Sequence, residues 1–250
     1  MQDRYTGDVG DFGKYGLLRA LMSGGTHERL GVVWYLAPPE DNGDGRHRGY
    51  LNQPKRFRHC DQDLYDAMER LERAGRRDVA AVEESGVLGK ETLYFGRLLC
   101  ASPDPGVGPA ATALRRRYRA EWVKMALAAM AGADLVFLDP DNGIGGTSFR
   151  AHGSKGHKHA SWDEIRQFAA DGARTLVCYH HTGRNGTAKE QAAALVGEIA
   201  GSMALGFQRG TSRIFLVAPA RGRASLVRER VDEFLRKWGE GAGDHFTMLA

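Results

Sequence analysis

Three polar segments carry the residues whose types suit chemistry, and each follows an apolar run. Asp139-Pro140-Asp141-Asn142-Gly143 follows one run, His180-His181-Thr182-Gly183-Arg184 follows another, and Glu40, Asp41 and Asp44 follow a third. Ligands of open α/β sheets bind beyond the carboxyl ends of the strands, so we expect these segments to meet in one crevice. Asp139, Asp141 and His180 are the candidate catalytic residues, with Asp139 expected as an exposed carboxylate at a strand end.

The acidic residues also suit a metal ion, because carboxylates are hard oxygen ligands for Mg²⁺. In a metal-dependent nuclease or phosphodiesterase, Asp139, Asp141 and Asp11 would bind Mg²⁺, and Lys14 or His180 would stabilise the phosphate. The Asp-Pro-Asp-Asn-Gly segment is also a good turn sequence and lacks the full calcium-loop pattern. Neighbouring strand residues point to opposite faces, so we expect at most one of His180 and His181 to enter the site. No residue is assigned as a dedicated metal ligand.

Two arginine-rich segments interleave basic and aromatic side chains. The segments are Lys55-Arg56-Phe57-Arg58-His59 and Arg115-Arg116-Arg117-Tyr118-Arg119, and the net charge of the whole chain is only +4. Such segments hold phosphates while rings stack on bases, or they are solvated arginines on helix faces. The candidates for nucleic-acid contact are Arg56, Arg58, Arg115, Arg116, Arg117 and Arg119. A non-catalytic nucleic-acid-binding protein is therefore a further alternative.

The composition predicts one folded domain. The chain has 250 residues, of which 42% are hydrophobic and 26% charged, and this length can bury one substantial core. Three widely spaced cysteines predict reduced thiols rather than a disulfide framework. No apolar run approaches the ~18 residues of a membrane helix, and the first residues carry no apolar signal region. We expect a cytoplasmic protein without a membrane partner, and the oligomeric state is left open.

Apolar runs and helical spacing place the elements that position these residues. Strands are predicted over 30–36, 92–99, 133–138, 175–179, 213–218 and 246–249, and helices over 15–22, 61–73, 110–130, 162–170, 188–203 and 225–238. The alternation of strand and helix from residue 133 predicts a mostly parallel sheet covered on both faces. We therefore expect an α/β fold, a Rossmann-like three-layer sandwich over 1–250, with an insertion at about 40–128. His152, His157 and His159 lie on a Gly- and Lys-rich segment predicted to be a mobile lid.

The segment from Gly7 to Leu18 resembles the opening of a known enzyme family. Gly7, Asp11 and Lys14 fall at the spacing of the adenine-N6 methyltransferase J family, which acts on large-subunit ribosomal RNA. The likeness continues in order through Trp34-Tyr35-Leu36, Leu138-Asp139-Pro140 and Val177 to Arg184, and the family also carries a helical insertion where this chain has residues 40–128. The segments 7–15 and 139–143 are also similar to bacterial proteins without an assigned activity.

The resemblance implies a methyltransferase-type fold and S-adenosylmethionine as cofactor. The family's early lysine helps to hold the methionine carboxylate of that cofactor, a role that would fall to Lys14 with Asp11 beside it. The family's Asp-Pro-Pro-aromatic motif grips the target adenine amino group, and Asp139-Pro140 would be its remnant, although Asp141 and Asn142 stand where the family has proline and an aromatic. Glu40, Asp41 or Asp44 would bind ribose hydroxyls. The leading hypothesis is a methyltransferase-like enzyme that acts on nucleic acid or a nucleotide.

Overall fold

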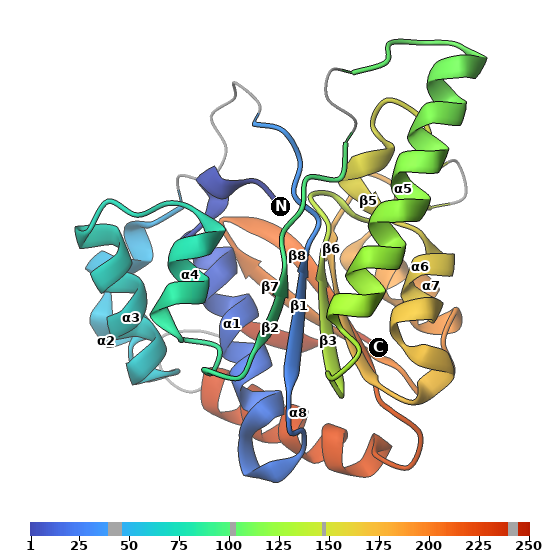
Figure 1. The fold of residues 1–250 in the computed structure, drawn as a ribbon. Helices are drawn as coiled ribbons and strands as arrows, with labels where there is room; N and C mark the ends of the chain where they lie inside the picture. The colour runs from blue at the N-terminus through green and yellow to red at the C-terminus, as the bar shows by residue number, and fades with distance from the viewer. Residues whose placement is uncertain (40–46, 101–103, 147–148, 240–244) are drawn as a thin grey trace.

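A seven-stranded sheet forms the centre of the computed structural model, which describes residues 1–39, 47–100, 104–146, 149–239 and 245–250 (Figure 1). The strand order is β2-β1-β3-β6-β8-β7-β9. The strands are β1 Leu30–Trp34, β2 Leu93–Phe95, β3 Leu135–Asp139, β6 Thr175–His181, β7 Met203–Arg209, β8 Thr211–Ala218 and β9 Phe246–Met248. The first four in this order are parallel, whereas β8 runs antiparallel to both β6 and β7, and β9 runs antiparallel to β7.

Helices cover both faces of the sheet, which confirms the predicted three layers (Figure 1). One apolar cluster joins the sheet to α1 Val9–Met22, α3 Gln62–Arg73, α4 Val79–Ser85 and α8 Ala224–Gly239. The other joins it to α5 Pro109–Ala129, α6 Trp162–Phe168 and α7 Ala188–Gly197. A short helix, α2 Pro54–Phe57, lies beside α3, and β4 Gly143–Ile144 pairs with β5 His159–Ala160 in a separate small sheet. The fold is a Rossmann-like α/β sandwich.

The central strands alternate between the two apolar clusters because successive side chains point to opposite faces. In β3, Phe137 packs on the α1 side, whereas Val136 and Leu138 pack on the α5 side. Both faces are apolar, so the run Leu135–Asp139 is buried throughout. This is the pattern of a parallel strand covered by helices on both sides.

Two expectations about the elements need correction. The helix expected over 188–203 ends at Gly197, and the missed strand β7 follows at Met203 and forms a hairpin with β8 through Gly210, whose φ is +74°. The range 40–128 is not wholly an insertion. It supplies β2 to the edge of the central sheet and α5 to one helical layer, because Phe95 and Trp122 pack together at 5.2 Å between ring centroids.

The order of the strands creates a switch point between β1 and β3. The chain leaves β1 toward β2 on one side, and β3 and β6 extend the sheet on the other side. In doubly wound sheets, ligands bind beyond the carboxyl ends of the strands at such a point.

Among the described helices, none combines the length and apolarity that a bilayer crossing requires.

Candidate active site

A cavity of about 240 Å³ lies at the carboxyl ends of β3 and β6, beside the first turns of α1. Four predicted residues line it: Asp11, Lys14, Asp139 and Asp141. Sequence reasoning did not select the other polar side chains of its wall, which are Tyr5, Asp8, His47, Asn142, Tyr179, His181 and Arg213. Segments that lie far apart in the sequence, from Met1 to Arg213, therefore converge on this crevice.

Asp8 begins α1 and sets the position of the site residues on it. Its carboxylate accepts a hydrogen bond from the Asp11 backbone nitrogen at 3.0 Å, so it caps the helix. Asp11 and Lys14 are three residues apart and share one face of the helix, and their charged groups lie 2.7 Å apart. The Asp11 carboxylate also accepts from the Gly7 backbone nitrogen at 3.0 Å and from the Tyr15 hydroxyl at 3.2 Å.

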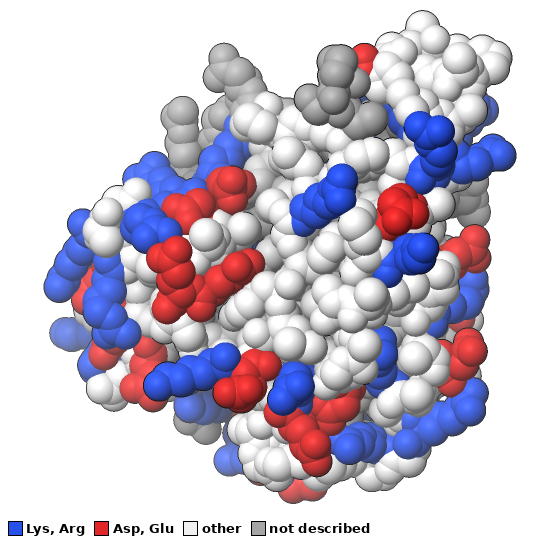
Figure 2. All heavy atoms as spheres, in the orientation of Figure 1, with Lys and Arg blue, Asp and Glu red and all other residues white. Residues whose placement is uncertain are grey.

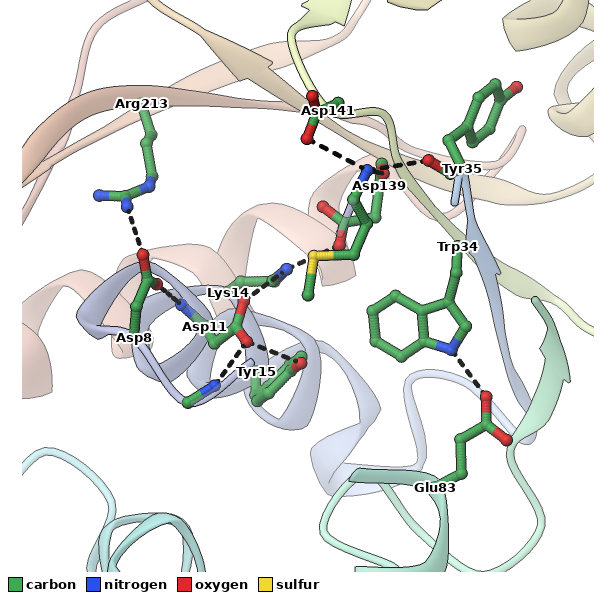
Figure 3. Close-up of polar contacts among 12 residues, drawn as sticks. Asp8, Asp11, Lys14, Tyr15, Trp34, Tyr35, Glu83, Asp139, Asp141 and Arg213 are labelled. Atoms are coloured by element: carbon green, nitrogen blue, oxygen red, sulfur yellow. Dashed lines mark hydrogen bonds and ion pairs between the residues drawn. The ribbon is translucent and has the colours of Figure 1, made fainter. Parts of the chain in front are cut away.

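Lys14 lies between two carboxylates in the interior (Figure 3). Its Nζ is 2.7 Å from Asp11 Oδ1 and 2.7 Å from Asp139 Oδ2, and the three side chains are exposed by only 6%, 3% and 4%. Burial alone would favour the neutral amine, but the two carboxylates outweigh it and hold the pKa of Lys14 above its usual value. Burial raises the pKa of Asp11 even though Lys14 opposes that shift. Asp139 is therefore a buried ion-pair partner, not the exposed carboxylate that was expected.

This arrangement does not suit the cofactor role implied for Lys14. A cofactor carboxylate approaching this ammonium group would meet the charges of Asp11 and Asp139, which already bind it. The same ammonium group occupies the space between the two carboxylates where Mg²⁺ would have to bind. Within the described residues, no cluster of three or more acidic, histidine or cysteine side chains could hold a metal ion. Glu40, Asp41 and Asp44 lie outside the described residues.

Asp141 forms an acceptor-rich end of the crevice (Figure 3). Its side chain is 3% exposed, and its Oδ2 accepts from Gln2 Nε2 at 3.3 Å and lies 3.5 Å from Lys158 Nζ. Its Oδ1 is buried without a hydrogen-bond partner. The amino group of Met1 lies 3.7 Å from that oxygen and donates to the carbonyls of Tyr35 at 2.8 Å and Asp139 at 3.2 Å. The crevice thus already accommodates an amino group among oxygen acceptors.

The structure places His181, not His180, at the cavity. His180 accepts a hydrogen bond from the Ile144 backbone nitrogen through Nδ1 at 3.1 Å, and burial lowers its pKa to about 4. It is therefore neutral, and it holds the segment after β3 against β6. His181 lies one residue on, shares the face of Tyr179, and has its Nδ1 3.2 Å from the Tyr179 hydroxyl. Strand alternation predicted that only one of the two histidines would enter the site, but it did not reveal which.

Arg213 brings β8 to the crevice. Its guanidinium donates to the Asp8 carboxylate at 3.2 Å and to the Arg209 carbonyl at 2.7 Å. Because β8 runs antiparallel to β6, its first residues lie at the same edge as the carboxyl end of β6. The predicted strand 213–218 was found, but its direction was not predicted from the sequence.

The arginine candidates do not form one surface. Arg56 and Arg58 belong to the region of α2, whereas Arg115, Arg116 and Arg117 lie on α5, on the opposite side of the molecule (Figure 1). Arg58 pairs with Asp66 at 2.7 Å, and Arg115 pairs with Asp104 at 2.5 Å. Arg119 is buried and bound to Glu164 at 2.6 Å, so its role is internal and not the predicted contact with nucleic acid.

No protein-family description matches this chain, and no curated protein matches it either. The class that the fold and site define is a Rossmann-like α/β protein with a charged crevice at the switch point of its sheet.

Proposed function

We propose that this protein is a methyltransferase-like enzyme that acts on an amino group of a nucleotide unit. The observation that carries the proposal is the buried Oδ1 of Asp141 on the wall of the switch-point crevice, which accepts no hydrogen bond from the described residues and has the Met1 amino group near it, at 3.7 Å. A buried acceptor that lacks a hydrogen bond is destabilising, so a ligand that donates to this oxygen removes that cost when it binds. A donor of the amino type satisfies this oxygen together with the neighbouring backbone carbonyls.

Exocyclic amino groups of nucleobases fit this chemistry, because each offers N–H donors to the Asp141 carboxylate and the backbone carbonyls beside it. The carbonyl oxygens of Tyr35 and Asp139 already accept from one amino group, that of Met1. A nucleobase amino group would compete with Met1 for this place. The ring of Tyr179 and the imidazole of His181, on the neighbouring strand, supply flat surfaces beside it.

S-adenosylmethionine is the proposed methyl donor, but Lys14 is not proposed as its anchor. The two carboxylates that bind Lys14 make that residue a structural element of the crevice floor. Arg213 is the other buried cationic side chain of the crevice wall among the described residues, and Asp8 partly neutralises it. The donor would therefore have to bind through contacts that differ from those of the resembling family.

Calorimetric titration tests this proposal, first with S-adenosylmethionine and S-adenosylhomocysteine, then with adenosine and cytidine monophosphates, and separately with Mg²⁺. We expect micromolar binding of the cofactor and at least tenfold weaker nucleotide binding in Asp141→Asn, because the amide replaces one acceptor oxygen by a donor. Asp163→Asn, an exposed position on α6, is the matched control. If neither cofactor binds and Mg²⁺ binds in an Asp141-dependent manner, the transferase proposal fails in favour of phosphodiester chemistry.

A further inference from the structure

A group of exposed cations lies over the first half of α5 and the segment that packs against it. Arg116 on α5 and Arg150 and Lys155 on the segment 149–159 are all exposed, and we call these three residues the α5 basic surface. Lys and Arg side chains gather over this part of α5 in the space-filling view (Figure 2). The segment 149–159 holds three Lys or Arg residues and three histidines but no Asp or Glu.

Arg119 explains why these two distant segments lie together. Its guanidinium donates to the carbonyls of Gly156 at 2.7 Å and His159 at 2.6 Å, and it pairs with Glu164 of α6. The predicted lid is therefore anchored on α5 through the backbone. Burial lowers the pKa of His152, and the nearby charge of Arg116 on α5 lowers it further. The helix and the segment 149–159 therefore face each other.

The segment 149–159, called the basic segment below, is also continuous with the candidate active site. It begins just after β4 and ends at β5, and these strands pair Gly143 with His159. The Asn142 backbone nitrogen donates to the Lys158 carbonyl at 2.8 Å, and Lys158 Nζ lies 3.5 Å from Asp141. The segment 149–159, which carries two residues of the α5 basic surface, is thus bound directly to the segment that carries Asp139 and Asp141.

A second cavity, of about 350 Å³, lies between α5 and the basic segment. Arg115, Tyr118, Ser154 and His157 are among its lining residues, so it offers a guanidinium, hydroxyls, an imidazole and an aromatic ring. Asp104 is the acidic residue of this wall among those described, and it is bound to Arg115. Arg115 and Arg119 are both paired, so the attraction for an anionic ligand comes from Arg116, Arg150 and Lys155, whose chain neighbours line this cavity. The size of the cavity is that of a nucleotide rather than of a duplex.

From this arrangement we infer that the α5 basic surface binds the phosphodiester backbone of a single-stranded nucleic acid and leads one nucleotide to the crevice. The inference rests on the proposed function, and it identifies the substrate as a polynucleotide rather than a free nucleotide. Phosphates would contact Arg116, Arg150 and Lys155, while the base of a neighbouring nucleotide enters the second cavity beside Tyr118. Such contacts release counterions, so binding weakens steeply as the salt concentration rises.

Fluorescence anisotropy with a labelled single-stranded oligonucleotide tests the inference at several salt concentrations. Each phosphate contact in a single strand contributes about 0.7 to the slope of log K against log salt. We expect the Arg116→Ala and Lys155→Ala double variant to lower the magnitude of that slope by roughly 1.4 relative to the native protein. The matched control is the double variant Arg221→Ala and Arg236→Ala, which removes two exposed cations after β8 and on α8, away from the crevice.

The outcomes separate this inference from the proposed function. An unchanged slope in the Arg116 and Lys155 variant overturns the inference, as does an equal loss in the control, even when calorimetry shows that cofactor and mononucleotide bind. The converse result is a reduced salt slope in the Arg116 and Lys155 variant while calorimetry detects no binding of cofactor or nucleotide. That result supports nucleic-acid binding by the α5 basic surface and overturns the proposed methyltransferase function. Preference for a duplex of the same sequence over the single strand also contradicts the inference.

Discussion

The ammonium group of Lys14 lies 2.7 Å from the carboxylate of Asp139, which follows it 125 positions later in the chain. This contact joins the first helix to the end of the central strand β3, and Asp11 completes the buried group from the other side. Buried charges persist only when they are paired and hydrogen-bonded. The floor of the crevice is therefore held by charge pairing rather than by apolar packing.

Replacing Lys14 by methionine should strongly destabilise the protein. The substitution leaves Asp11 and Asp139 buried without a cation, and breaking a buried pair in this way costs about 3–5 kcal/mol. Urea denaturation followed by circular dichroism measures the change. Lys90→Met, at an exposed position, serves as control and should shift stability by less than about 0.5 kcal/mol. A loss of under about 1 kcal/mol for Lys14→Met would show that the pairing does not hold the floor.

Arg119→Met should be similarly destabilising, since it leaves the Glu164 carboxylate buried and unpaired, at a loss of about 3–5 kcal/mol. Combining it with Glu164→Gln should recover much of that loss. Glutamine removes the charge but still accepts from the Ser161 backbone nitrogen in the capping box. Thermal unfolding measures the stability of the single and the double variant. If the double variant is as unstable as Arg119→Met, the bonds of Arg119 to the 149–159 backbone matter more than the charge.

Gly143→Ala should displace the segment that carries Asp141. Gly143 has a φ of +93°, and a Cβ there would lie 2.5 Å from His180 Cα, a backbone atom that cannot move away. We expect a loss of about 1–3 kcal/mol from the backbone conformation alone, together with loss of ligand binding. Gly146→Ala, where a Cβ meets nothing within 4 Å, is the control on the same segment. Equal melting temperatures for the two variants would contradict this account.

The stability of the protein should fall between about pH 6.5 and pH 4 through His180. Burial lowers its folded-state pKa to about 4, against about 6.5 in the unfolded chain, so the unfolded state binds the proton first. The stabilisation is therefore complete above the unfolded pKa and is lost as the pH drops toward the folded one. His180→Asn keeps an acceptor for the Ile144 backbone nitrogen but cannot titrate. Unfolding measured across this pH range should show a shallower fall for the variant, and identical profiles would exclude His180 as a cause.

The layered fold could be predicted because its strands are buried on both faces. The run Leu135–Asp139 is apolar up to its last residue, and that pattern is typical of a covered parallel strand. The start of α1 was harder to predict. Gly10, Gly13 and Gly16 lower the helix propensity of its first half, so the helix was expected only from residue 15, whereas packing and the Asp8 cap begin it at Val9.

The candidate site could be predicted only in part. The rule that ligands bind at strand ends identified Asp139 and Asp141, and the family resemblance identified Asp11 and Lys14. Neither signal could reveal that Lys14 pairs with both Asp11 and Asp139, because the second pair depends on a contact between a helix and a distant strand. His181 and Arg213 were missed because the choice between the faces of β6, and the direction of β8, depend on the tertiary arrangement.

The packing of Gly16 against Trp238 bears on the order in which the molecule folds. A Cβ on Gly16 would lie 2.0 Å from the indole ring of Trp238, so the first helix fits closely against the last one. Contacts between residues so distant in sequence form late, because closing the long intervening loop is entropically unfavourable. During synthesis, α1, which carries Asp11 and Lys14, is therefore not fully covered until α8 packs against it. A nascent chain that stops short of α8 would expose the apolar face of α1, and the crevice would mature only after α8 has been synthesised.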